Sequence, residues 1–325
     1  SLQNWFNIHQ RDLPFRLDKD PYRVWISEIM AQQTQIDTMI PYFNRWMTQW
    51  PTFEALSQAE ETQLLKAWEG LGYYSRVRNI HKAAQILKER DFIFPSTLEE
   101  IRALPGIGPY TAAAIASICF ETKAVAIDGN VSRVVSRLYC FEDELGSKPL
   151  LNNVTEKMET WMIEATPSVF TQAMMELGAL ICTPKNPQCE TCPLKESCLS
   201  YSNQSMTEYP KKKASKAKPE HHKSILIKLS PDHIIALTQN ADDNLMKGYW
   251  RFPEIQNIPK EAILLGQLRH VFTHLIWNLD FYLVQAPIDS NESWFSLEEI
   301  EALPLITAHR DFFHQIKSRI DASES

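Results

Sequence analysis

Glycine is scarce in this sequence, with nine in 325 residues, or about 3% against a typical ~7%. This scarcity argues against a glycine-rich β-sandwich and favours helices. Long apolar runs are also missing, because the longest candidate, residues 111–120, falls short of the ~18 uncharged apolar residues that a membrane helix needs. The sequence does not open with a basic segment followed by an apolar run, so we expect no signal peptide and a cytoplasmic location.

Positive charge is in deficit as well. Lys and Arg total 33 against 40 Asp and Glu, which gives a net charge of −7. Taken alone, this balance argues against a nucleic-acid partner, because phosphate binding needs local positive charge. A basic patch can still supply that charge. Lysines concentrate in one place, at Lys211, Lys212, Lys213, Lys216 and Lys218.

Residues 1–200 show helical periodicity without alternation of strand length. Apolar residues recur at helical spacing from Tyr22 to Trp50, where Pro41 is expected to kink or split the helix. Further helices are predicted over residues 60–69, 76–90, 97–103, 109–119, 129–139, 150–165 and 168–181. The pattern indicates an all-α domain over residues 1–200.

Residues 201–220 are polar, basic and bracketed by prolines, which is the composition of a linker. After it, residues 222–229 and 232–239 predict two strands joined by a Ser-Pro-Asp turn. Residues 268–284 predict one or two more strands, and residues 296–320 a helix. We therefore expect a smaller second domain, residues 221–325, of the α/β or α+β class.

Four of the six cysteines lie within 17 residues of one another. They are Cys182, Cys189, Cys192 and Cys198. Because no secretion signal is seen, disulfides are not expected, and the spacing indicates a metal or cluster site. Four thiolates can hold either structural zinc or a [4Fe–4S] cluster, and the spacing does not decide between them.

A glycine-containing turn, Leu-Pro-Gly-Ile-Gly-Pro-Tyr-Thr, separates two predicted helices at residues 104–111. Gly106 and Gly108 are expected to adopt positive φ, and Pro109 suits the first turn of a helix. Backbone N–H groups at such a helix start can bind a phosphate without side-chain charge, which would let an acidic protein hold DNA. An ordinary tight connection between two helices is the alternative.

Two carboxylates are candidates for catalysis. Glu28 is followed by Gln32 and Gln35, so the three are expected on one helical face. Burial in a cleft would raise the pKa of Glu28 and suit it to general acid catalysis, although a solvated surface glutamate is the simpler interpretation of this residue alone. Asp128 precedes a predicted helix, where aspartate commonly serves as an N-cap.

Five segments together resemble the adenine DNA glycosylases of the MutY family, within the helix–hairpin–helix superfamily that also contains endonuclease III. They are PYRVWISEIMAQQTQ (21–35), GLGYYSRVRN (70–79), LPGIGPYTAAA (104–114), AIDGNVSRV (126–134) and MELGALICTP (175–184). The cysteine spacing adds to them, and together they span nearly all of residues 1–200 in family order. Ala113 stands where many relatives have glycine, for which we expect only a small packing adjustment.

The resemblance implies a helix–hairpin–helix glycosylase domain whose four cysteines hold a [4Fe–4S] cluster. It implies that Glu28 is the catalytic acid and Asp128 the second catalytic carboxylate, with Asn130 hydrogen-bonding in the site. Bifunctional members of the superfamily carry a lysine nucleophile where this sequence has Tyr110. A neutral phenol cannot form a Schiff base with the sugar, so a monofunctional enzyme is expected, in which Tyr110 positions Glu28 or the attacking water.

The resemblance also implies double-stranded DNA as the partner. Tyr73 and Gln33 are similar to the family's residues that intrude at the lesion, where an aromatic ring can fill a vacated stack. A monomer acting at the bacterial nucleoid is expected. Further DNA contacts are expected from Gln32, Thr34, Gln35, Gly106 and Gly108.

Residues 221–325 resemble the Nudix-like domain with which the family detects 8-oxoguanine opposite adenine. The matching segments are GYWRFPE (248–254) and RHVFTHL (269–275). The family usually has Phe-Ser-His where this sequence has Phe272, Thr273 and His274, and threonine keeps the hydroxyl. Without the resemblance, an ordinary strand would explain this segment. The sequence lacks the Glu-rich metal-binding helix of a Nudix hydrolase, so pyrophosphohydrolase activity is not expected.

The expected reaction is hydrolysis of the N-glycosidic bond of an adenine that is mispaired with 8-oxoguanine or guanine and flipped out of the duplex. Glu28 would protonate N7 of the base, and Asp128 would stay ionised beside an oxocarbenium-like sugar. The alternatives are an endonuclease III-like glycosylase with lyase activity and a lesion-binding protein without turnover.

Overall fold

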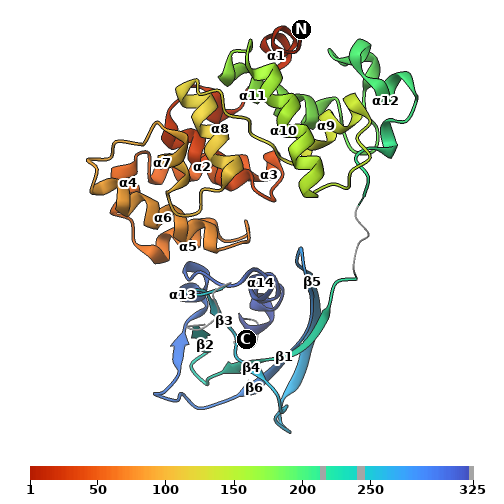
Figure 1. The fold of residues 1–325 in the computed structure, drawn as a ribbon. Helices are drawn as coiled ribbons and strands as arrows, with labels where there is room; N and C mark the ends of the chain where they lie inside the picture. Colours follow the sequence, from red (N-terminus) through yellow and green to blue (C-terminus); the bar gives the residue numbers. More distant parts are fainter. Residues whose placement is uncertain (213–216, 240–245, 322–325) are drawn as a thin grey trace. The chain divides into compact units, whose positions relative to one another are not determined.

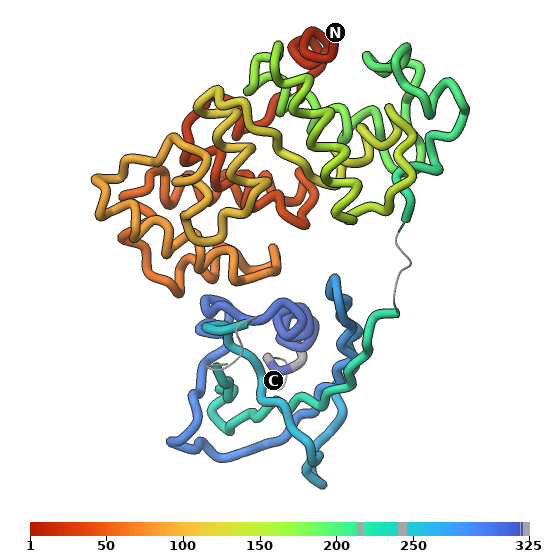
Figure 2. Tube along the Cα trace, in the orientation of Figure 1, coloured from red at the N-terminus to blue at the C-terminus, as the bar shows by residue number. Residues whose placement is uncertain are grey.

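The computed structural model describes residues 1–212, 217–239 and 246–321. The chain forms two compact units, which Figures 1 and 2 show as ribbon and tube. Unit 1 consists of Ser1–Ser57 and Lys82–Ser215, and unit 2 of Gln58–His81 and Lys216–Ser325. Lys213 and Lys216 of the predicted basic patch lie outside the described residues. No helix in the described ranges is long and apolar enough to cross a membrane.

Unit 1 is helical. Its α-helices are α1 (Leu2–His9), α2 (Pro21–Ala31), α3 (Ile36–Gln49), α4 (Phe53–Ser57), α7 (Leu98–Arg102), α8 (Pro109–Phe120), α9 (Gly129–Tyr139), α10 (Lys148–Met162), α11 (Pro167–Leu180) and α12 (Leu199–Ser202). Short 3₁₀ helices are η1 (Pro14–Arg16), η2 (Cys189–Thr191), η3 (Lys195–Ser197) and η4 (Met206–Glu208). The boundary between the units falls within α6 (Ser75–Lys88). The helices predicted between residues 76 and 181 agree closely with these bounds.

Pro41 does not split the helix, contrary to one of the two predicted outcomes. Pro41 lies inside α3, and the chain instead turns between α2 and α3, at residues 32–35. Gln33 has φ +58° there, a left-handed conformation that ends a helix. The Gln32 side chain donates to Thr111 Oγ1 at 3.1 Å, which holds this turn against α8.

Helix α8 forms the centre of unit 1. Its Ala112, Ala114 and Ala116 are fully buried, and such small side chains let α2, α7 and α11 pack closely against it. The buried hydroxyl of Thr171 on α11 donates to Ser117 Oγ on α8 at 2.9 Å. The start of α8 is thereby fixed relative to α2 and α11.

Unit 2 combines a mixed sheet with helices. Its strands are β1 (Glu220–Leu229), β2 (Ile235–Gln239), β3 (Trp250–Arg251), β4 (Glu254–Ile255), β5 (Ile263–Val271), β6 (Ile276–Gln285) and β7 (Ser293–Phe295), and its helices include α5 (Glu61–Trp68), α13 (Leu297–Ala302) and α14 (Thr307–Asp321). The strand order is β3-β2-β1-β6-β5, with β4 paired to β1 and β7 to β2. Helix α14 covers the sheet, where Phe312 stacks on Phe281 with ring centroids 3.8 Å apart. The predicted strands are confirmed, whereas the single helix predicted over residues 296–320 is two helices, α13 and α14, separated at residues 303–306.

Candidate active site

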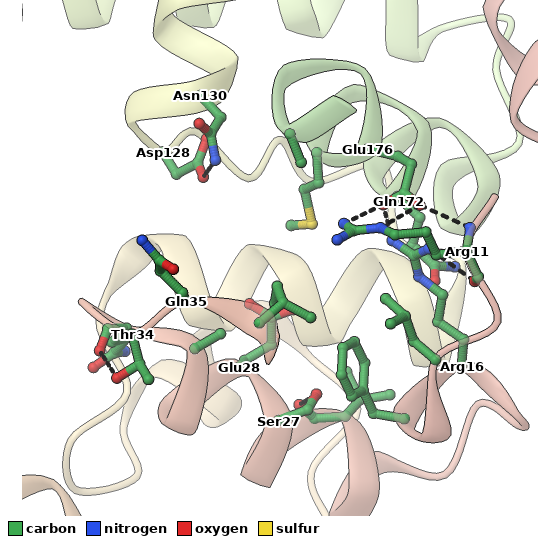
Figure 3. A pocket seen from close by; sticks show the side chains of 18 of the residues that line it. Arg11, Arg16, Ser27, Glu28, Thr34, Gln35, Asp128, Asn130, Gln172 and Glu176 are labelled. Atoms are coloured by element: carbon green, nitrogen blue, oxygen red, sulfur yellow. Dashed lines mark hydrogen bonds and ion pairs between the residues drawn. The ribbon is translucent and has the colours of Figure 1, made fainter. Parts of the chain in front are cut away.

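A cavity of about 660 Å³ lies in unit 1 among α2, α8, α9 and α11. Figure 3 shows Glu28 on the α2 side and Asp128 with Asn130 on the opposite wall, at the start of α9. The cavity brings together the predicted residues Glu28, Gln32, Gln33, Thr34, Gln35, Tyr110, Asp128 and Asn130. Segments that are far apart in the sequence therefore contribute to one site.

Glu28 lies near the end of α2, which also carries the fully buried Trp25. Burial raises the pKa of Glu28 to about 7. A hydrogen bond with Tyr110 and the charge of Arg16 oppose this rise, whereas the charge of Asp128 adds to it. The carboxyl can therefore hold a proton near neutral pH, as a general acid must.

Tyr110 is the second residue of α8, directly after the glycine-containing turn. Its hydroxyl is hydrogen-bonded to Glu28 and lies 3.9 Å from Met175 Sδ. Burial raises the pKa of Tyr110 well above its usual value, and the charges of Glu28 and Asp128 add to this. A neutral phenol at this position can orient the Glu28 carboxyl without supplying a positive charge.

Asp128 is the N-cap of α9. Its Oδ1 accepts a hydrogen bond from Val131 N at 2.7 Å, and its Oδ2 accepts one from Asn130 Nδ2 at 3.2 Å. The start of a helix favours negative charge, because the helix dipole is positive there. Asp128 therefore serves as the N-cap of α9 and also lines the cavity, so the two interpretations of this residue are compatible.

A chain of hydrogen bonds runs from Asp128 to the cysteine loop. Asn130 Oδ1 accepts from Arg133 Nη2 at 2.8 Å, and Arg133 Nε donates to Cys182 O at 2.8 Å. Gly178 on α11 packs against this chain, and a Cβ there would lie 2.8 Å from Asn130 Cβ. The orientation of Asn130 therefore depends on a glycine at position 178 and on the loop that begins at Cys182.

The cavity wall also carries a charged group that was not predicted from the sequence. Glu176, whose side chain is fully buried, accepts from Arg11 Nη2 and Arg16 Nη2, each at 2.8 Å, and from Arg11 Nε at 3.0 Å. These bonds outweigh the effect of burial and lower the pKa of Glu176 to about 2. The available signal was a glutamate among the apolar residues of the predicted helix 168–181. Figure 3 shows the three side chains together at one end of the cavity.

The glycine-containing turn agrees only in part with its prediction. Gly106 has φ +78°, as expected, but Gly108 has φ −84° and is the N-cap of α8. A Cβ at Gly108 would meet nothing within 4 Å, so the surrounding protein atoms leave room for a side chain there. The missing side chain leaves the start of α8 open to a ligand.

The prediction that Glu28, Gln32 and Gln35 share one face of a helix was also wrong. Helix α2 ends at Ala31, so both glutamines lie in the turn that follows it. The turn nevertheless places them on the cavity wall. Hydrogen bonding to Thr111 on α8, rather than helical spacing, accounts for the position of Gln32.

The four clustered cysteines surround one small pocket beside α9 and α11. Arg137 on α9 donates to Cys182 Sγ at 3.3 Å and to Thr183 O at 2.7 Å. Among the described residues, no three His, Cys, Asp or Glu side chains are arranged to hold a single metal ion. Zinc would require the sulfurs to converge on one centre, whereas a cluster of four irons takes one thiolate on each iron. The donor set therefore fits a [4Fe–4S] cluster.

The remaining predicted residues belong to unit 2. Phe272, in the turn between β5 and β6, packs edge-on against Trp277 at 4.8 Å between ring centroids. Thr273 and His274 beside it are exposed. Tyr73 is partly exposed and has φ +47°. The structure thus places these residues on exposed turns rather than in a core.

The helical fold, the turn before α8, the carboxyl-lined cavity and the four-cysteine loop define a helix–hairpin–helix DNA glycosylase. Residues 26–160 match the family described as HhH-GPD superfamily base excision DNA repair protein. Residues 182–198 match the iron-sulfur binding domain of endonuclease III, and residues 225–315 match the NUDIX domain. The loop at residues 182–198 is the binding site of a [4Fe–4S] cluster, and the protein binds DNA.

Similar proteins identify the family. The chain is 33% identical to the adenine DNA glycosylase of Buchnera aphidicola subsp. Baizongia pistaciae, over 98% of this chain and 96% of that protein. It is also 33% identical to that of Buchnera aphidicola subsp. Schizaphis graminum, over 94% of each. A solved thermostable thymine-DNA glycosylase aligns with a TM-score of 0.54 and 25% identity, over 62% of this chain and 94% of that one. The chain belongs to the adenine DNA glycosylases, enzymes that hydrolyse N-glycosidic bonds.

Proposed function

We propose that this enzyme excises adenine mispaired with 8-oxoguanine or guanine in duplex DNA, as a monofunctional monomer. The observation that carries the proposal is that Glu28, with a pKa of about 7, shares one cavity with Asp128. Adenine leaves poorly as an anion, so cleavage needs a proton on the base and negative charge beside the sugar. This substrate would place the enzyme at the nucleoid in the bacterial cytoplasm.

The cavity suits a base flipped out of the duplex. Its volume of about 660 Å³ lies in the range of small-molecule sites. Arg11, Arg16 and Glu176 offer donors and acceptors to the edge of a purine, which is how flipped bases are read. Buried polar groups left unpaired by a wrong base would disfavour its binding.

Each group in the cavity takes one part of the reaction. Glu28 donates its proton to N7 of adenine while the glycosidic bond breaks. A water molecule then adds to C1′ of the sugar and gives up a proton to a carboxylate of the site, which completes the hydrolysis. Asp128, held by Val131 N and Asn130, stabilises the positive charge that develops on the sugar. Tyr110 keeps the Glu28 carboxyl oriented.

Other elements serve DNA binding. Backbone N–H groups at the start of α8, after Gly106 and Gly108, bind phosphate. Tyr73 and Gln33 intrude at the mispair, and Phe272, Thr273 and His274 inspect the base opposite adenine. Cys182, Cys189, Cys192 and Cys198 hold the [4Fe–4S] cluster, which fixes the geometry of their loop.

Replacement of Glu28 by Gln tests the acid directly. The variant should bind a duplex with adenine opposite 8-oxoguanine and release no adenine, because an amide has no proton to give. Near-normal adenine release by Glu28→Gln would exclude Glu28 as the acid. The wild-type assay should include adenine opposite 8-oxoguanine, G, C and T, since equal rates on all four would contradict the proposed mispair specificity.

The alternative, a lyase of the endonuclease III kind, needs an amine nucleophile. None of the described residues that line the cavity is a lysine. Borohydride reduction with abasic DNA should therefore give no efficient covalent capture. Efficient capture would show that the enzyme is bifunctional.

A further inference from the structure

Residues 61–74 lie within the part of the sequence that matches the glycosylase family, yet they belong to unit 2 together with the C-terminal residues. Tyr249, which is fully buried, donates its hydroxyl to Leu65 O at 2.6 Å. Lys66 Nζ donates to Leu303 O at 3.3 Å. Helix α5 is therefore bonded to two separate C-terminal segments.

A largely buried ion pair joins the same segments. Glu69 and Arg310 have side chains only 11% and 7% exposed, with Oε1 and Nε 2.6 Å apart. Glu69 Oε2 also accepts from Leu305 N at 3.2 Å, and Arg310 donates to Leu303 O at 2.6 Å. Because removal of one partner would leave a buried charge uncompensated, the pair strongly favours one arrangement.

The loop after α5 places two neighbouring tyrosines in opposite environments. Tyr74 is buried, stacks on Tyr249 with ring centroids 4.0 Å apart, and shares a 2.8 Å hydrogen bond with Thr307 Oγ1. Tyr73 is partly exposed in a left-handed conformation, which costs free energy in any residue other than glycine. Such a conformation persists only where the surrounding contacts hold it.

We infer that Glu69 and Tyr74 are positioning residues that fix Tyr73 to the same rigid unit as Phe272, Thr273 and His274. The inference rests on the proposed function, which gives these two turns a joint task on the two sides of a mispair. Because both turns are carried by unit 2, recognition of 8-oxoguanine and intrusion of Tyr73 share one fixed geometry. Loss of the Glu69–Arg310 ion pair or of the Tyr74 contacts should therefore lower selectivity for 8-oxoguanine rather than weaken all DNA binding equally.

Arg310→Met and Tyr74→Leu test this inference. The measured quantity is the ratio of affinities for two duplexes that carry a non-hydrolysable adenosine analogue opposite either 8-oxoguanine or guanine. We expect this ratio to fall at least fivefold in both variants and to be retained in Tyr74→Phe, which keeps the ring stack. Phe313→Leu, which alters the sheet core beside Phe252, serves as a control for lost stability. Unchanged ratios in Arg310→Met and Tyr74→Leu would overturn the inference.

A second measurement does not depend on the reaction. Hydrogen–deuterium exchange of the amides of residues 64–74 should be at least tenfold faster in Arg310→Met than in Phe313→Leu. Equal exchange in the two variants would overturn the inference, whatever the substrate. If the wild type releases no adenine, the proposed function fails, and the exchange experiment still decides whether Glu69 and Arg310 anchor this loop.

Discussion

The Tyr110 hydroxyl is hydrogen-bonded to the Glu28 carboxyl. The neutrality of the phenol matters, because an opposite charge within a few ångströms lowers the pKa of a carboxyl by about 1–3 units. A lysine at this position would deprotonate Glu28 near neutral pH. A neutral tyrosine at this position therefore suits the role of protonated general acid that we propose for Glu28.

Tyr110→Phe should change the pH dependence of adenine release. The hydrogen bond from Tyr110 lowers the pKa of Glu28, so its removal should raise that pKa and extend activity to higher pH. The maximal rate should fall about tenfold, because the carboxyl loses its orientation. Single-turnover rates between pH 5 and 9 would measure both effects. If the rate of Tyr110→Phe falls at the same alkaline pH as the rate of the wild type, the hydrogen bond does not influence the pKa of Glu28.

Glu28→Gln should change how stability depends on pH. The pKa of Glu28 is about 7 in the folded protein, against an ordinary value of 4.5. The contribution of protonated Glu28 to the free energy of unfolding is therefore fully present below pH 4.5 and is lost as the pH rises through 7. Glutamine cannot ionise, so the variant should gain up to about 3 kcal/mol relative to wild type between pH 4.5 and 9. Urea unfolding at several pH values measures this. Glu159→Gln, at an exposed position, should show no such trend.

Gly178→Ala should impair the site through Asn130. The added Cβ would lie 2.8 Å from Asn130 Cβ, so Asn130 or α11 must shift and the contact of Asn130 with Asp128 is disturbed. We expect adenine release to slow at least tenfold and the free energy of unfolding to fall by about 1–3 kcal/mol. Phe170→Leu, in the core on the same helix, is a control with a similar loss of stability and a near-normal rate. A normal rate for Gly178→Ala would argue against a role for Asn130.

Arg137→Met should weaken the hold on the cluster. Arg137 donates to Cys182 Sγ, to Thr183 O and, at 3.0 Å, to Pro184 O, so its loss leaves several acceptors of the loop without a donor. Decay of the cluster's visible absorbance in the presence of a chelator should be about tenfold faster than in wild type. The exposed Arg102→Met is the matched control. Equal decay in both variants would contradict this role.

Local patterns predicted much of the fold. Apolar residues at helical spacing predicted α9 and α11, because one face of each helix must be buried. Helix α8 is a continuous apolar segment and is buried on all sides. The boundary between the two helices of residues 22–50 was predicted at the wrong residue. It lies at Gln33, whose left-handed backbone conformation cannot be predicted from its residue type. Glu176 was missed as a site residue because Arg11 and Arg16, which stabilise its buried charge, are distant in the sequence.

The amino-acid sequence alone specifies which groups are present: the four cysteines, Asp128 at a helix start, Gly106 in the turn and Glu28 in a largely apolar segment. The raised pKa of Glu28 arises only in the folded chain, because its burial and the charges of Asp128 and Arg16 depend on segments that are distant in the sequence. Only the tertiary structure joined residues 58–81 to the C-terminal part of the protein. Composition and spacing report on neighbours along the chain, whereas desolvation and charge interactions depend on distances in space.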